Sequence, residues 1–374
     1  MGEHILVTGG AGFVGSHLTD ALLAQGHQVR VFDSLESQVH GAEGGVPEYL
    51  NRDAELVRGS LTDAAAVRRA LEDIDVVFHQ AALVGVGQSM YDIARYCQVN
   101  TGGAGVLLEE VVKRRDRIRK VVVASSMSVY GEGAYRTTLG EVRFPRVRAR
   151  DLLEHQQWEA LDAETGEVLA PIPTPESKPL HPTSVYAITK RDHEELFLTV
   201  GYAYRMPTVA LRYFNIYGER QALSNPYTGV AAIFSARVLN GQPPVIFEDG
   251  RQSRDFVHVS DVVRANLLAL ATERADYQAL NVGTGRAVTV HQVADAILGA
   301  LGACDVAPTV LGTFREGDVR HCYADIGLAR TLLEYEPTVS FADGVGQLVA
   351  WVRQQRASDR FERAHHELVA RGLA

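Results

Sequence analysis

Two hydrophobic patterns alternate along about the first 280 residues of the chain. Short, continuous apolar runs are typical of strands buried on both faces, and they are separated by stretches in which apolar residues recur every three or four positions, as on one face of a helix. The expected strands cover 4–8, 28–33, 54–59, 75–80, 120–125, 208–213 and 279–282. The expected helices cover 16–25, 64–71, 101–114 and 262–271. This alternation predicts an α/β fold with a doubly wound parallel sheet.

The segments outside that pattern predict a second, smaller lobe. A chain of 374 residues exceeds the size at which a single core stops growing, about 250–300 residues. The expected division is a first domain over 1–215 with a returning segment at about 258–285, a lobe over about 216–257 and 286–350, and a helical tail over 351–374. A ligand cleft is expected where the lobe faces the carboxyl ends of the strands.

Two further segments need separate interpretation. The stretch 132–181 is charged, contains Trp158 and a Pro-rich run at 171–175, and is longer than ordinary connections, so it predicts an inserted cap or interaction element. In the tail, 356–373, a weak apolar stripe predicts a terminal helix docked on the lobe.

The loop between the first expected strand and helix reads Gly9-Gly10-Ala11-Gly12-Phe13-Val14-Gly15. Gly9 and Gly12 permit a tight turn and close backbone approach to a pyrophosphate, and Gly15 lets the helix pack on the strand. The second strand ends in Asp33, at the distance expected for a carboxylate that binds an adenosine ribose and repels a 2′-phosphate. The glycine loop and Asp33 together predict a Rossmann-type NAD site, with Phe13 and Val14 beside the phosphates. The alternative is that the glycines only form a turn and Asp33 only caps a strand.

Composition narrows the classes of function. A formal charge of −9 without a basic cluster argues against a nucleic-acid surface. Three scattered cysteines form neither a disulfide framework nor a metal-ligand pattern, so we expect a reducing compartment and no metal. No apolar run reaches the about 18 residues of a membrane span, and the first strand leaves no room for a signal peptide, so a cytoplasmic enzyme without membrane contact is expected.

Candidate proton chemistry lies later in the chain. Tyr186 and Lys190 are four residues apart, which places them on one face of a helix, where an ammonium can stabilise a phenolate beside a positively charged nicotinamide. Such a tyrosine serves as a base near neutral pH. Ser126 follows a parallel strand at the same sheet edge and can hydrogen-bond a substrate oxygen. These three groups are the predicted catalytic residues.

With these motifs in order, the chain resembles the extended short-chain dehydrogenase/reductase superfamily, in its NAD-dependent nucleotide-sugar epimerase/dehydratase branch. The resemblance runs from Ile5 to about Tyr335 and includes the glycine loop, the Tyr186/Lys190 pair and motifs at 78–82, 99–100, 125–131, 211–218, 254–261 and 315–320. It implies that the partner is a nucleotide-sugar substrate. It also implies a homodimer packed through helices at about 101–114 and 184–200.

The resemblance also assigns further site residues. Asn215, Arg254 and Arg315 hold the diphosphate, and Asp318 binds a nucleotide ribose hydroxyl. The remaining cofactor contacts implied are Ser60, Leu61, Gln80, Ala81, Ala82, Asn100, Ser125 and Tyr213. The remaining substrate contacts implied are Val84, Met127, Ser128, Val245, Phe247 and Cys322.

Three of these positions depart from the family pattern. Ser60 stands where an adenine-binding Asp is usual, so the Leu61 amide is left for that role, and Val84 stands where hexose epimerases often carry a Lys. Cys322 stands where those enzymes gate the sugar pocket, and its small side chain leaves space there, although a packed thiol is the commoner fate.

The residues after Ser126 indicate which reaction to expect. Dehydratases of this branch carry two acids there, whereas this chain has Met127 and Ser128, which cannot act as a carboxyl acid or base. A 4-epimerase of a UDP- or dTDP-hexose is therefore the leading interpretation. An NAD-dependent oxidoreductase or decarboxylase on the same fold is the alternative, and a non-catalytic NAD sensor is a remote one.

Overall fold

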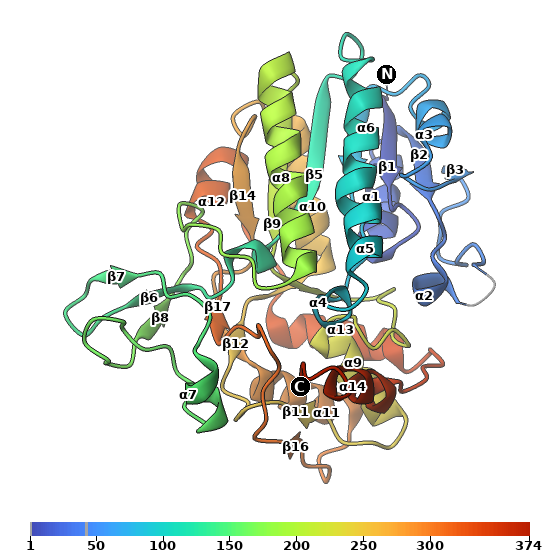
Figure 1. Ribbon diagram of the computed structural model, residues 1–374. Coiled ribbons are helices and arrows are strands. Elements are labelled where there is room, and N and C mark those ends of the chain that lie inside the picture. Colours follow the sequence, from blue (N-terminus) through green and yellow to red (C-terminus); the bar gives the residue numbers. More distant parts are fainter. Residues whose placement is uncertain (1, 42–43) are drawn as a thin grey trace.

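A sheet of seven strands forms the centre of the larger lobe in the computed structural model, which describes residues 2–41 and 44–374. The strand order is β14-β9-β5-β4-β1-β2-β3, and every neighbouring pair is parallel (Figure 1). The strands are β1 His4–Thr8, β2 Gln28–Asp33, β3 Glu55–Arg58, β4 Val76–His79, β5 Lys120–Ser126, β9 Thr208–Tyr213 and β14 Ala279–Val282. The predicted doubly wound fold is confirmed, because the order reverses between β1 and β4.

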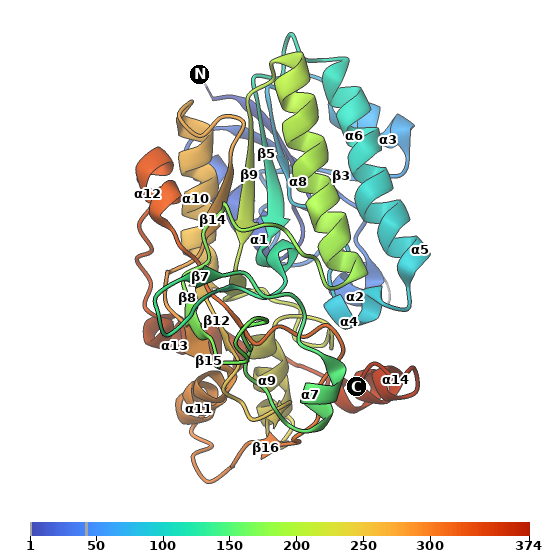
Figure 2. The same cartoon turned by 60° about the vertical axis from the view of Figure 1, so that its left-hand side comes forward.

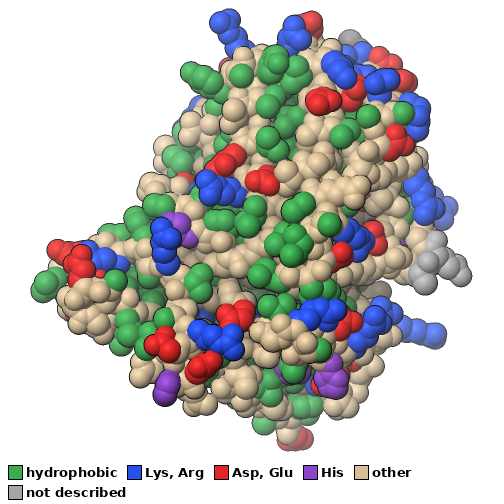
Figure 3. Space-filling view, in the orientation of Figure 1, with side chains coloured by type: hydrophobic (Ala, Val, Ile, Leu, Met, Phe, Trp, Pro, Cys, Tyr) green, Lys and Arg blue, Asp and Glu red, His purple; other side chains and the backbone are tan. Residues whose placement is uncertain are grey.

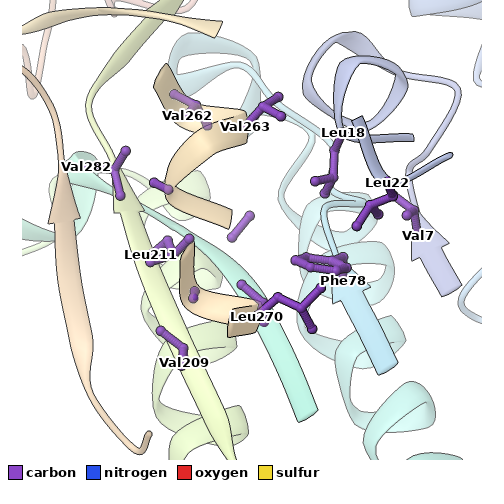
Figure 4. Close-up of a cluster of buried hydrophobic side chains, with 14 of the residues drawn as sticks. Val7, Leu18, Leu22, Phe78, Val209, Leu211, Val262, Val263, Leu270 and Val282 are labelled. Carbon is purple, nitrogen blue, oxygen red and sulfur yellow. The ribbon is translucent and has the colours of Figure 1, made fainter. Parts of the chain in front are cut away.

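Helices cover both faces of this sheet. Along β1, Ile5 and Val7 join one buried cluster and Leu6 joins the other, as the two-residue period of a strand requires. The first cluster packs under α1 Phe13–Ala24, α10 Val259–Ala271 and α12 Gly327–Leu333, and Figure 4 shows side chains from α1, α10 and the strands meeting there. The second packs under α3 Ala64–Ala70, α6 Gly103–Val112 and α8 Val185–Tyr204.

Short helical turns join these elements at the edge where the strands end. They are α2 Ser37–His40, α4 Val86–Ser89, α5 Ile93–Tyr96, a π-helix η1 Cys97–Gly102 and a 3₁₀ turn η2 Met127–Tyr130. The helix expected at 101–114 therefore begins earlier, as a π-helical turn that continues into α6.

The smaller lobe lies below the sheet in Figures 1 and 2. Its helices α9 Val230–Leu239, α11 Val290–Leu301 and α13 Phe341–Val352 share a separate buried cluster. Its short strands are β10 Asn215–Tyr217, β11 Val245–Ile246, β12 Ser253–Arg254, β13 Phe256–His258, β15 Val288–Thr289, β16 Thr309–Val310 and β17 His321–Cys322. One segment was wrongly placed by sequence: α12 falls inside the predicted lobe stretch 286–350 but packs on the sheet, where Ala329 and Leu333 are buried.

The insertion projects to the left in Figure 1. It forms a small antiparallel sheet of β6 Ala134–Arg136, β7 Val142–Arg143 and β8 Ala170–Ile172, together with the short helix α7 Arg150–Glu154. The tail helix α14 Phe361–Val369 follows α13. Sequence predicted that it docks on the lobe, but it contacts both lobes, as described below.

The surface is polar and mixed in charge. On the face shown in Figure 3, basic and acidic side chains are interspersed among apolar ones. Within the described part of the chain, none of the helices is both long enough and apolar enough to cross a bilayer.

Candidate active site

A cavity of about 660 Å³ lies between the two lobes, at the carboxyl ends of the sheet strands. It is lined on one side by the ends of β2, β5 and β9 and by the loops that follow β1 and β4, and on the other side by the smaller lobe. It brings together nearly all the residues singled out by sequence: Gly9, Gly12, Phe13, Val14, Gly15, Asp33, Ser60, Leu61, Gln80, Ala81, Ala82, Val84, Ser125, Ser126, Met127, Ser128, Tyr186, Lys190, Tyr213, Asn215, Val245, Phe247, Arg254, Arg315 and Asp318.

The glycine loop after β1 is shaped to receive a phosphate group. Gly9 has φ +69°, and a Cβ there would lie 2.7 Å from the Ala81 backbone, so only glycine fits between these two loops. Gly12 precedes the first turn of α1, and no side chain caps that turn. The first amides of α1 are therefore free to donate to an anion in the cavity, and the helix dipole favours that anion.

Asp33 at the end of β2 is fixed by the same loop. Its carboxylate accepts hydrogen bonds from the Ala11 amide at 3.1 Å and the Leu35 amide at 2.9 Å, and the residue is 8% exposed. Each oxygen keeps a lone pair for a second donor, such as a ribose hydroxyl. The loop and this carboxylate fit a dinucleotide with a free 2′-hydroxyl.

The three predicted catalytic residues come from two neighbouring elements. Ser126 ends β5, while Tyr186 and Lys190 lie on α8, which begins where the Ser184 hydroxyl accepts from the Ala187 amide at 3.1 Å. The Lys190 ammonium donates to the Ala124 carbonyl at 2.9 Å, which fixes it against β5.

Burial sets the protonation of these groups. It raises the pKa of Tyr186 to about 12, opposed by a hydrogen bond with Ser126, and it lowers the pKa of Lys190 to about 7. Tyr186 therefore keeps its proton at neutral pH in the protein alone, so its use as a base requires added positive charge beside it.

Two buried histidines lie close to Lys190. His79 Nδ1 shares a hydrogen bond with Thr8 Oγ1 at 2.8 Å, His193 Nε2 pairs with the Asn100 carbonyl at 3.1 Å, and the two rings are 4.9 Å apart. Burial lowers the pKa of His79 to about 3, and burial also lowers that of His193, with Lys190 acting in the same direction in both. Both rings are therefore neutral, and they add no charge beneath the ammonium.

A buried ion pair braces the strand that carries Ser126. Glu194 on α8 accepts from the Ser125 hydroxyl at 2.7 Å and from Arg212 Nε at 2.9 Å. Arg212 also donates to the Tyr130 hydroxyl at 2.7 Å. The hydroxyl of Ser125 thus donates into the protein, whereas Ser126 Oγ accepts from the Ser128 amide and hydroxyl, at 3.2 and 2.9 Å.

Carboxylates are distributed unevenly around the cavity. Within the described chain, its lining includes only four: Asp33, Glu36, Glu316 and Asp318. The first two lie at or after the end of β2, and the last two lie in the loop before β17. Met127 and Ser128, the positions after Ser126, supply none, so residues 2–41 and 44–374 place no carboxyl acid or base next to the catalytic hydroxyls in the lining.

The smaller lobe supplies cations and unpaired polar atoms. Arg315 pairs with Asp318 at 2.7 Å and its guanidinium lies 4.7 Å from the centre of the Phe247 ring. Burial raises the pKa of Asp318, but Arg315 and Arg254 outweigh it and hold that pKa below its ordinary value. Asn215 Oδ1 is buried and has no partner among the described residues. The two arginines fit an anionic ligand, and the buried Asn215 oxygen, which lines the same cavity, can accept a hydrogen bond from a donor group of that ligand.

Two predicted contacts do not face the cavity. Cys322 is 1% exposed, lies outside the cavity lining and has its sulfur 3.8 Å from the Thr174 hydroxyl, so it is a packed thiol. Asn100 is also buried away from the cavity. It instead donates to the Leu83 carbonyl and accepts from the Leu83 amide, at 3.1 and 2.8 Å, and so holds the loop after β4.

Sequence reasoning also missed several lining residues. Gln221 and Gln252 each leave a buried side-chain oxygen without a partner within the described part of the chain, and both line the cavity. Gln221 follows the motif at 211–218 and Gln252 precedes the motif at 254–261, so closeness to these motifs was the signal that could have indicated both residues. Phe361, His365 and Leu368 line it from α14, and nothing in their local sequence indicates that position.

Comparison with known proteins agrees with this geometry. Residues 5–146 and 159–283 match the NAD dependent epimerase/dehydratase family. The chain belongs to that family. The unmatched stretch 147–158 falls within the insertion and contains α7. The resemblance predicted from the motifs is thus confirmed, as is the cofactor, which is NAD.

Relatives and solved structures cover nearly the whole chain. A dTDP-L-rhamnose 4-epimerase of Burkholderia thailandensis is 36% identical over 356 residues, covering 95% of this chain and 96% of the relative. The structure of a UDP-glucose 4-epimerase of Thermotoga maritima with UDP-glucose is 34% identical, with a TM-score of 0.76 over 94% of this chain and 99% of that one. The structure of a UDP-glucose 4-epimerase of Thermus thermophilus with NAD is 31% identical, with a TM-score of 0.74 over 94% and 100%.

Proposed function

We propose that this protein is an NAD-dependent 4-epimerase of a hexose linked to UDP or dTDP. The observation that carries the proposal is the chemistry around Ser126 and Tyr186, where two hydroxyls and one amine line the cavity and, among the described residues, no carboxyl group adjoins Ser126 in the lining. Elimination of water from the sugar needs an acid and a base in addition to the tyrosine that takes the O4 proton. Inversion through a ketone needs only these protein groups together with NAD as the hydride carrier.

In this reaction Tyr186 takes the proton of the sugar O4, and Ser126 hydrogen-bonds that oxygen as it becomes a carbonyl. The glycine loop and Asp33 would hold NAD, which would supply the hydride acceptor for C4 and the source of the returned hydride, with a 4-keto sugar between the two transfers. Lys190, in its protonated form, stabilises the phenolate form of Tyr186. Tyr186 gives the proton back to O4 when the hydrogen returns to the opposite face of C4, so the enzyme ends each turnover unchanged.

Inversion requires the ketone to turn over while the nucleotide stays bound. In this proposal Arg254 and Arg315 hold the diphosphate and Asp318 holds the ribose, because arginine forks match phosphate oxygens and a carboxylate accepts from a ribose hydroxyl. Val84 and Met127 line the sugar end with apolar side chains. A ring held by few hydrogen bonds turns more readily than one that is pinned at several hydroxyls.

The test uses isotopes to separate epimerisation from the alternatives. Purified protein with its own NAD is incubated with UDP-glucose, UDP-galactose, dTDP-glucose, dTDP-L-rhamnose or UDP-glucuronic acid in deuterium oxide, and products are followed by proton NMR. The expected product is the C4 epimer with no solvent deuterium on carbon. Deuterium at C5 or C6 would indicate dehydration, and net NADH or loss of a carboxyl carbon from UDP-glucuronic acid would indicate the oxidoreductase or decarboxylase instead.

Substitution of the catalytic tyrosine provides the residue-level test. Tyr186→Phe removes the proton acceptor and should lower kcat by about 10²–10⁴-fold, the usual contribution of a positioned acid or base, while NAD stays bound. Tyr202→Phe is the matched control, because Tyr202 lies on the same helix α8 but is 76% exposed. A Tyr186→Phe enzyme as active as Tyr202→Phe would exclude the proposed role.

A further inference from the structure

The tail after α13 is fastened to the smaller lobe at its beginning. The Ser358 amide donates to Ser224 Oγ at 3.0 Å. Arg237 of α9 donates to Asp359 and Glu362, each at 3.2 Å, and its guanidinium lies 4.6 Å from the centre of the Phe361 ring. These contacts fix the first turn of α14 against α9.

The second half of α14 reaches across to the larger lobe. The hydroxyls of Tyr91, near α4, and Tyr227, in the smaller lobe, both donate to Glu367 at 2.8 Å, and the two hydroxyl oxygens are 2.5 Å apart. These bonds lower the pKa of Glu367. Arg371 lies 4.2 Å from the centre of the Tyr91 ring. One carboxylate on the tail therefore joins both lobes.

The tail also closes against the loop that carries the predicted ribose contact. The Glu316 amide donates to the Leu373 carbonyl at 3.0 Å, beside Arg315 and Asp318. On the other side, Leu368 lies so close to Gly87 that a Cβ there would be 3.2 Å from its Cδ2 atom. In Figures 1 and 2, α14 lies below α4 and α5 and beside α9.

The inner face of α14 forms an aromatic cluster with the smaller lobe. His365 is stacked with Phe361, with ring centres 5.7 Å apart and planes 16° apart, and meets Phe247 edge-on at 5.6 Å. Arg315 lies against Phe247 as well. All four residues line the cavity, and His365 Nδ1 is buried without a partner among the described residues.

We propose that the tail forms one wall of the nucleobase pocket and that His365 contacts the base of the nucleoside diphosphate. The inference rests on the proposed function, since that function places the diphosphate at Arg254 and Arg315 and the ribose at Asp318. The base then extends toward Phe247 and the cluster around it. Planar rings offer a stacking surface for a heterocycle, and the unpartnered ring nitrogen offers one hydrogen bond to its edge.

This assignment gives the tail a role in specificity rather than in chemistry. The aromatic contacts of His365 are with Phe247 and Phe361, in the nucleotide half of the cavity. Its loss should therefore weaken nucleotide binding and leave NAD binding and hydride transfer unchanged. Stacking of a base on an aromatic side chain contributes about 1–3 kcal/mol, and tenfold in affinity corresponds to about 1.4 kcal/mol. Loss of the His365 ring should therefore weaken nucleotide binding by about tenfold.

The test compares two adjacent histidines on α14. His365→Ala and His366→Ala are purified with bound NAD, and UDP, dTDP, CDP, ADP and GDP are titrated by calorimetry. His366 is exposed and does not line the cavity, so it is the matched control. The expected result is a roughly tenfold weaker Kd for the preferred diphosphate in His365→Ala, with His366→Ala and NAD content unchanged. A higher KM with unchanged kcat should accompany it.

The outcomes separate this inference from the proposed function. If the wild type binds UDP or dTDP and His365→Ala binds it equally well, the base does not contact His365 and the inference is wrong. If the wild type prefers a purine diphosphate and His365→Ala weakens binding of that diphosphate, the contact between His365 and the base is supported, and the UDP or dTDP assignment fails. If the wild type binds none of the five, the nucleotide-sugar function itself is wrong and the inference falls with it.

Discussion

Arg148 connects the insertion to the nucleotide end of the cavity, and its loss should destabilise the protein. Its guanidinium donates to Glu248 at 2.7 and 3.1 Å, to the Trp158 carbonyl at 2.9 Å and to the Asp318 carbonyl at 3.0 Å, while the whole residue is 8% exposed. Glu132 lies 3.4 Å from its Nε. The insertion is thus bonded to Glu248, which follows Phe247, and to the backbone of the loop that contains Arg315.

Arg148→Met keeps the aliphatic stem and removes the charge and its donors. Breaking a buried pair costs about 3–5 kcal/mol, because the partner carboxylate is left without compensation. Glu248 also accepts from Arg320 at 3.0 Å, so the lower end, about 3 kcal/mol, is expected. Unfolding entropy of about 2.1 cal/mol/K per residue gives about 0.8 kcal/mol/K for 374 residues, so Tm should fall by about 4 °C.

Differential scanning calorimetry of the NAD-bound protein measures this shift. Arg150→Met is the control, since that arginine is two residues further on, its side chain is 64% exposed, and its pairs with Glu154 and Glu316 lie at the surface. Exposed ion pairs contribute little net stability because water screens them, so Tm should change by about 1 °C or less. If Arg148→Met melts within 1 °C of the Arg150→Met control, the reasoning about the buried charge is refuted.

Two other predictions concern the cofactor and acid stability. Asp33→Asn removes the charge that repels a 2′-phosphate, so the preference for NAD over NADP should drop by about tenfold, or about 1.4 kcal/mol, in paired Kd measurements; an unchanged ratio would contradict the role of Asp33. Burial lowers the pKa of His79 to about 3 and also lowers that of His193. Below pH 6.5, the ordinary pKa of histidine, the unfolded chain therefore binds more protons at these two residues than the folded protein does. Stability should therefore fall as pH drops from about 6.5 toward 3, and His193→Leu should flatten that loss in urea titrations, whereas an unaltered slope would argue against it.

The sheet and the cofactor end could be predicted because their signals are local. A buried parallel strand is apolar throughout, and the glycine loop and Asp33 lie within one βαβ unit, so periodicity and spacing suffice. Residues at the ends of β5 and on α8 were also placed correctly in the cavity. Their convergence follows from one rule, that parallel strands end at the same edge.

The errors concern positions that depend on long-range packing. Cys322 and Asn100 occupy motif positions, but the direction of a side chain is decided by neighbours such as Thr174 and Leu83, which no motif specifies. For α14, the weak apolar stripe signals a docked helix without saying what it docks on. Its position depends on Tyr91 and Tyr227, which are separated from Glu367 by 276 and 140 residues.

The order of the strands has a consequence for synthesis on the ribosome. Five of the seven strands, β3-β2-β1-β4-β5, have been synthesised once Ser126 is added to the chain. The next strand of the sheet, β9, pairs with the outer edge of β5 and begins only at Thr208. About 80 residues of insertion and α8 are translated in between, which takes about 4–16 s at 5–20 residues per second. During that interval one edge of the β5 backbone is unpaired, and the flanking Val121, Val122 and Val123 side chains, fully buried in the finished protein, make that strand strongly apolar. The nascent chain is then most prone to pair with another strand, so chaperone capture should concentrate in this window of elongation.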